Sequence, residues 1–149
     1  MYCAGSTRTS GAKSRKFIIE VPVIDGFFSG TGDLFAGLTL ARLREQSEIS
    51  GLLGVDSWIP SDDVAAVDLP LAKAVQGVLA SMNGVLVRTK TERDRILQEM
   101  EATGHFEGKD QKEVHIMRTR ASELRLVQSR RELMDPGAIE GRYTIEPFV

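Results

Sequence analysis

The segment from Asp33 to Arg44 constrains the fold more than any other part of the sequence, because it predicts a helix that is apolar almost all round. The apolar side chains are not confined to one stripe: they are Leu34, Phe35, Ala36, Leu38, Leu40, Ala41 and Leu43. Such a helix belongs in a protein interior. Arg42 and Arg44 are expected in its last turns, where cations suit the helix dipole.

Two stretches before this helix have the composition of strands. Met1 to Ala4 is a short apolar run that reaches Gly5, and Lys16 to Val23, "KFIIEVPV", is rich in β-branched residues up to Pro22. We expect them to form a hairpin or neighbouring strands. A strand pattern that begins with no lead-in is a first indication of a missing N-terminal part.

A second, longer helix is predicted from Leu69 to about Glu101. Apolar residues recur there in steps of four and three, at Leu71, Val75, Val78, Met82 and Val85. Asp68 is the expected N-cap, with Pro70 tolerated in the first turn. The Gly- and Pro-containing segment from Gln46 to Asp68 is predicted to be a loop, held down by Trp58 and Ile59.

The C-terminal third predicts short elements. Glu101 to Glu113 is read as a polar connector, Leu124 to Ser129 ("LRLVQS") as a third strand, and "RRELMDP" as a short helix stopped by Pro136. Strands and helices that alternate loosely indicate an α/β fold. Three strands form too small a sheet to cover the apolar helix, so we expect the chain to be part of a larger α/β domain. In the isolated chain, the uncovered side of this helix would be an exposed apolar surface prone to association.

Composition narrows the classes of partner. The 149 residues suit one domain, and the net charge of −2 gives no indication of a nucleic-acid partner. No apolar run approaches membrane-spanning length, and the polar start "MYCAGSTRTSGAKSRK" favours a cytoplasmic location over a secretory signal. Cys3 is interpreted as a small core residue, and His105 and His115 as surface histidines rather than metal ligands.

The stretch "SGTGD", Ser29 to Asp33, opens the apolar helix with a pair of glycines and one acid. Backbone N–H groups at a helix start lack intrahelical partners, and glycines let a ligand approach them closely. The stretch is therefore a candidate phosphate cradle formed by Gly30, Thr31 and Gly32. Asp33 would repel a phosphate, so it suits the role of general base for an attacking hydroxyl.

Other interpretations of the same glycines compete with the cradle. "GDLFAGLT" has the glycine spacing of a P-loop, but Leu38 stands where lysine is required, which excludes it. "GTGDLF" begins like a dinucleotide fingerprint, but Phe35 occupies the third glycine position. A purely structural alternative stays open, in which the glycines form a tight turn and Asp33 caps a core helix.

These residues resemble the pyridoxal kinases of the ribokinase-like superfamily. The stretch "FFSGTGDLFAGLTLARLRE" is similar to their phosphate-binding signature in a form that looks fungal, "LPLAKAVQGVLASMNGVLVRT" to the following helix, and "ELRLVQSRRELMDP" to the C-terminal strand and helix. Family members are about twice as long. Residues 1–149 therefore resemble the C-terminal portion of a three-layer α/β sandwich whose N-terminal half is absent.

The resemblance implies ATP-dependent phosphorylation of the 5′-hydroxymethyl group of pyridoxal, pyridoxine or pyridoxamine. It implies that Asp33 is the catalytic base, that Gly30, Thr31 and Gly32 form the anion hole, and that the nucleotide is bordered by Val21, Pro22, Val23 and Ile24. It further implies Mg²⁺, a monovalent cation such as K⁺, and a cytoplasmic homodimer for the full-length protein.

Two alternatives remain. A related kinase for a hydroxymethylpyrimidine would share the GTGD element, although not the "LRLVQS" ending. The alternative of a different class is a non-catalytic nucleotide-binding or interaction remnant. Because the absent half carries most of the vitamin pocket, the isolated chain is expected to be inactive.

Overall fold

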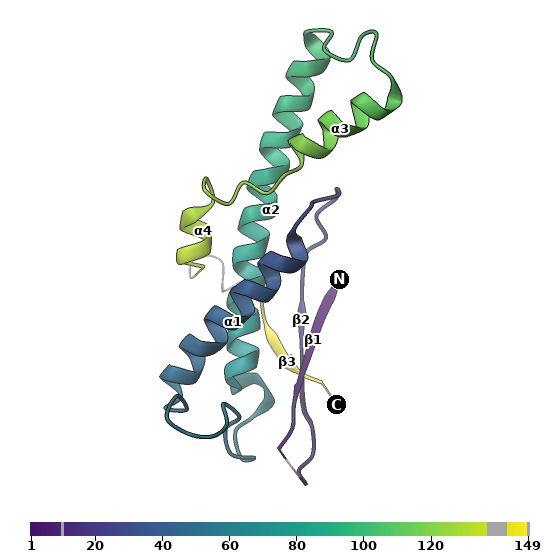
Figure 1. Cartoon of the computed structure of the whole chain (residues 1–149). Helices are drawn as coiled ribbons and strands as arrows, with labels where there is room; N and C mark the ends of the chain where they lie inside the picture. The colour runs from purple at the N-terminus through teal and green to yellow at the C-terminus, as the bar shows by residue number, and fades with distance from the viewer. Residues whose placement is uncertain (10, 137–142, 149) are drawn as a thin grey trace.

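The structure is a computed structural model that describes residues 1–9, 11–136 and 143–148, a mixture of helices and strands (Figure 1). In chain order the elements are β1 (Tyr2–Thr7), β2 (Arg15–Glu20), α1 (Thr31–Ile49), the 3-10 turn η1 (Ala66–Asp68), α2 (Pro70–Ala102), α3 (Gln111–Ala121), α4 (Arg130–Met134) and β3 (Ile145–Pro147). The predicted α/β class is confirmed.

The described strands form one antiparallel sheet in the order β1-β2-β3. The predicted hairpin of the first two strands is confirmed, with Gly5 directly opposite Phe17. A Cβ atom on Gly5 would collide with the Phe17 ring, which is fully buried. Glycine is therefore required at this position for Phe17 to enter the core.

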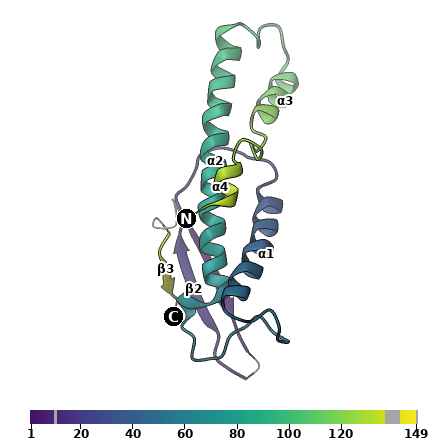
Figure 2. The same ribbon diagram turned by 90° about the vertical axis from the view of Figure 1, so that its left-hand side faces the viewer.

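The core lies between this sheet and α2. Phe17 and Ile19 of β2 are fully buried and join Leu69, Val75 and Leu79 in one apolar cluster. Figure 2 shows α2 between the sheet and α1, so that α2 is the central element of the molecule. Burial of apolar surface on both sides makes α2 the main source of stability.

Helix α1 confirms the predicted helix, but its expected interior position is wrong for this chain. Among its described residues only Ser47 is buried, and the Leu40 side chain is 67% exposed. The physical reason is that α2 covers one side of α1, whereas Leu40 lies on the uncovered side. The expected exposed apolar surface is thereby confirmed.

The ends of both long helices differ from expectation. Helix α1 continues to Ile49, so Arg42 and Arg44 are not in its last turn, and part of the expected loop is helical. Arg42 instead donates hydrogen bonds to the Ser81 hydroxyl of α2, at 3.0 Å, and the Leu133 carbonyl of α4, at 2.9 Å. It thereby links three helices.

Asp68 does not cap α2, because it belongs to η1 and pairs with Lys73 at 3.5 Å. Pro70 lies in the first turn, as predicted, and is the first residue of the helix, whereas the predicted start was Leu69. The charged second half of the segment continues the same helix. Ion pairs between neighbouring turns, such as Lys90 with Asp94 at 2.6 Å, support this part.

The sequence interpretation missed α3, which begins inside the expected polar connector. Its start carries a capping box: Asp110 accepts from the Glu113 backbone N–H at 2.8 Å, and the Glu113 carboxylate accepts from the Asp110 N–H at 3.0 Å. In Figure 1, α3 folds back beside the distal half of α2, and the two stand clear of the sheet.

The third strand predicted at Leu124 to Ser129 is wrong. Leu126 to Ser129 form a turn, and Glu123, the residue before the segment, makes an isolated parallel bridge with Ser29. The Ser129 N–H is satisfied locally by the Arg125 carbonyl at 2.9 Å, which leaves no ladder to extend. The short helix before Pro136 is confirmed as α4, and the third strand is instead β3.

Candidate functional site

Gly30 shapes the backbone at the predicted phosphate cradle. It is the residue before α1 and has φ 83° and ψ 7°, in the left-handed region that glycine adopts without strain. The first helical hydrogen bond runs from the Leu34 N–H to the Gly30 carbonyl at 3.1 Å. The N–H groups of Thr31, Gly32 and Asp33 therefore have no intrahelical acceptor and are available to a ligand.

The outer side of this turn is open. A Cβ atom placed on Gly32 would meet no atom within 4 Å, and Gly30, Gly32 and Asp33 are exposed. Asp33 forms no ion pair with any other residue that the structure describes, so its carboxylate is accessible to a ligand. An anion can thus approach the helix start with Asp33 beside it.

The second predicted group, Val21 to Ile24, follows β2 directly and lines an apolar pocket of about 410 Å³. Phe35 of α1 and Leu79 of α2 also line it. Phe35 is one helical turn beyond Thr31, so α1 connects the pocket to the turn at Gly30. Sequence reasoning assigned Phe35 no role at the site.

Cys3 also lines this pocket, and it packs against the core cluster as its interpretation as a core residue requires. Burial raises the pKa of the Cys3 thiol. A raised thiol pKa disfavours the nucleophilic thiolate, so the pocket offers an apolar surface rather than a reactive one.

The three stretches that carried the resemblance meet in space. Ser29 bridges to Glu123, and the Leu124 side chain lies 3.9 Å from where a Cβ of Gly30 would be. The backbone N–H of Arg125 donates to the hydroxyl of Thr89, on α2, at 3.1 Å. Sequence reasoning missed Thr89, since nothing local marks a buried helical threonine as a partner for a distant turn.

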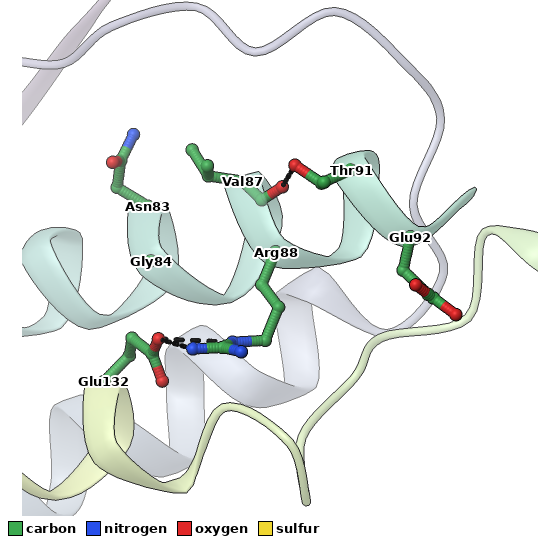
Figure 3. A pocket seen from close by; sticks show the side chains of 7 residues that line it. All are labelled: Asn83, Gly84, Val87, Arg88, Thr91, Glu92 and Glu132. Atoms are coloured by element: carbon green, nitrogen blue, oxygen red, sulfur yellow. Dashed lines mark hydrogen bonds and ion pairs between the residues drawn. The ribbon is translucent and has the colours of Figure 1, made fainter. Parts of the chain in front are cut away.

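A second pocket, of about 520 Å³, lies between α2 and α4, and none of the predicted site residues lines it. Figure 3 shows Arg88 reaching from α2 to the carboxylate of Glu132 on α4. This hydrogen-bonded ion pair lowers the pKa of Glu132. The ion pair fixes α4 on α2.

The described residues contain no cluster of three or more His, Cys, Asp or Glu side chains that could hold a metal ion. His105 and His115 are exposed, as expected for surface histidines. The residues present suit an anion at the helix start. Of the described helices, none is sufficiently long and apolar to cross a membrane.

Comparison with known proteins gave two fungal relatives. The chain is 37% identical over 141 residues to the Schizosaccharomyces pombe protein named "Putative pyridoxal kinase C18.10", an alignment that covers 93% of this chain and 37% of that protein. It is 34% identical over 89 residues to "Putative pyridoxal kinase C6F6.11c" of the same organism, covering 60% of this chain and 24% of that protein. No protein-family model matches.

The mixed α/β structure agrees with these relatives, because pyridoxal kinase homologues imply a ribokinase-like fold. Within that fold class, the chain is similar in sequence to the pyridoxal kinases, and the resemblance to their fungal members is confirmed. The chain spans little more than a third of the length of the first relative.

Proposed function

We propose that the chain supplies the phosphate-binding turn and the catalytic base of a pyridoxal kinase. The reaction is ATP-dependent transfer of a phosphoryl group to the 5′-hydroxymethyl group of pyridoxal, pyridoxine or pyridoxamine. The observation that carries the proposal is the left-handed Gly30 at the start of α1, with free N–H groups and an exposed carboxylate on the same turn.

In this proposal the N–H groups of Thr31 and Gly32 donate to the oxygens of the phosphoryl group as negative charge develops on them. Asp33 accepts the proton of the attacking hydroxyl, which makes that oxygen a better nucleophile. Both groups belong to the first turn of one helix, so the backbone fixes the N–H groups and the Cα atom of Asp33 relative to one another.

ATP supplies the phosphoryl group, and Mg²⁺ neutralises charge on its phosphates. The open space outside Gly32 and the orphan N–H groups fit a phosphate. The turn offers one carboxylate, that of Asp33, so bound Mg²⁺ would take most of its ligands from the nucleotide. Val21 to Ile24, which line the apolar pocket, border the nucleotide in this proposal. A monovalent cation such as K⁺ assists the phosphoryl transfer.

The chain corresponds in this proposal to residues from the C-terminal portion of a longer cytoplasmic, homodimeric kinase. The described residues provide no evident grip on a pyridine ring next to Asp33, and the exposed side of α1 lacks a covering layer. The isolated chain therefore binds ATP weakly and is inactive. A hydroxymethylpyrimidine kinase is the alternative substrate class, and a non-catalytic remnant is the alternative without activity.

The phosphate cradle is tested by titrating the isolated chain with ATP and following backbone amides by NMR. We expect saturable shifts at Thr31, Gly32 and Asp33, with Gly51 as an unaffected control in another turn. Gly32→Val, which places a branched side chain in the open approach, should abolish the shifts. Equal shifts in wild type and variant, or none at this turn in the folded wild type, would contradict the cradle.

A further inference from the structure

Thr89 of α2 connects the helix that carries the core with the turn that is proposed to bind phosphate. We propose that Thr89 is a positioning residue, which holds the Gly30 turn in its left-handed conformation through the segment Glu123 to Arg125. The importance of Thr89 for catalysis rests on the proposed function, whereas its role in holding the Gly30 turn does not depend on any ligand.

The hydrogen bond of Thr89 differs from those of other helical threonines in this protein. Thr39, Thr91 and Thr119 each donate their hydroxyl to the backbone carbonyl four residues earlier, at 2.7, 3.0 and 2.9 Å. The Thr89 hydroxyl accepts a hydrogen bond from Arg125, 36 residues away in sequence, at 3.1 Å. Thr89 is also fully buried, so its side chain is directed inward to a tertiary partner.

The effect of this bond continues to the turn along the backbone. Arg125 follows Leu124, whose side chain lies behind Gly30, and Glu123 forms the parallel bridge with Ser29. The segment therefore bridges to Ser29 and lies next to Gly30, while its own position is fixed by Thr89. If the Arg125 N–H lost its acceptor, a partly buried donor would be unsatisfied and the segment would be free to shift.

Arg93, one turn beyond Thr89, supports the residues of the same loop that directly precede Ser29. Its guanidinium lies over the Phe28 ring, 5.5 Å from the centroid, and occupies the space that a side chain at Gly26 would need. Helix α2 thus holds the loop before α1 at Phe28 through Arg93 and at Ser29 and Gly30 through the segment that Thr89 fixes. A displacement of about 1 Å at a catalytic group can cost about 10²-fold in rate, so such support matters to catalysis.

The test compares Thr89→Val, which removes the acceptor at similar volume, with Thr89→Ser, which keeps it. Thr91→Val is the matched control, because Thr91 lies two residues further along α2 and is exposed. Amide hydrogen exchange is measured by NMR on the ligand-free chain at Arg125, Leu34 and the core residue Val78. A lost hydrogen bond of about 1.4 kcal/mol corresponds to about tenfold faster exchange.

We expect about tenfold faster exchange at Arg125 and Leu34 in Thr89→Val, restoration by Thr89→Ser, and no change at Val78 or in Thr91→Val. Faster exchange at all amides alike would show a general stabilising role and overturn the proposal. Faster exchange at Arg125 with an unchanged Leu34 would overturn it too, because the turn would not depend on Thr89.

A second variant keeps the test decisive should Thr89→Val not fold. Leu124→Ala removes the side chain behind Gly30 without touching the buried hydroxyl, and it should accelerate exchange at Leu34 but not at Arg125. An unchanged Leu34 in this variant would contradict the proposed path. Because no nucleotide is present, these results are separate from the ATP titration, and either proposal can fail without the other.

Discussion

Helices α1 and α2 have similarly apolar sequences, but the structure uses them differently. Eleven residues of α2 are buried, against one of α1, and α2 lies between the sheet and α1. Helix α1 instead carries the Gly30 turn and Asp33 at an exposed end. Helix α2 therefore supplies stability, whereas α1 supplies the proposed chemistry. One side of α1 packs on α2 and its other side is exposed.

The largest expected effect is a loss of catalysis, caused by a substitution at the start of α1. The test uses a chimera in which this chain replaces the matching region of the first S. pombe relative. In this chimera, Asp33→Ala should lower turnover with pyridoxal by about 10²–10⁴-fold, the usual size of general-base catalysis. ATP affinity should change little, since removing an anion does not weaken phosphate binding. Steady-state kinetics decide it, and turnover within a few-fold of the parent chimera would refute the assignment of the base.

The same truncation on each helix tests the comparison directly. Leu79→Ala, at a site that is 8% exposed on α2, should lower the free energy of unfolding by about 2–5 kcal/mol. Leu40→Ala, at a site that is 67% exposed on α1, should change it by less than about 0.5 kcal/mol. Urea denaturation of both variants provides the measurement. Equal losses would mean that α1 is as enclosed as α2.

The smallest effect concerns the attachment of α4 to α2. Arg88 lowers the pKa of Glu132 below its ordinary value of 4.5, so this pair stabilises the fold above pH 4.5, and the contribution disappears as the pH falls through the lower pKa of the folded state. Glu132→Gln should therefore be less stable than wild type at pH 7, by a margin that shrinks in acid. Denaturation curves at several pH values measure this margin, and a constant margin down to pH 3 would contradict the role of the ion pair.

The sequence predicted those parts of the fold that local patterns determine. The start of α1 follows from its glycines, and α2 follows from the recurring apolar residues that begin at Leu71. The capping box of Asp110 and Glu113 could have revealed α3, although the segment is too polar for hydrophobic periodicity. The burial of α1 was harder to predict, because its apolar pattern could not show that Leu40 is exposed.

The errors occurred where structure depends on distant partners. The "LRLVQS" segment has the composition of a strand, but the N–H of Arg125 bonds to a helix rather than to a neighbouring strand. Strand β3 is three residues long and too short for a pattern. The candidate site was predictable at Gly30 to Asp33, whereas its supports, Thr89 and Arg93, become visible only when α2 is placed beside the turn.

In the proposed function, this chain carries the base and the phosphate-binding turn of a pyridoxal kinase but only part of its active site. The most direct measurement is the rate of pyridoxal 5′-phosphate formation with ATP, Mg²⁺ and K⁺, by the isolated chain and by the chimera. We predict no detectable product from the isolated chain and turnover by the chimera, because phosphoryl transfer depends on positioning both reactants. Turnover by the isolated chain equal to that of the complete S. pombe relative would contradict the claim.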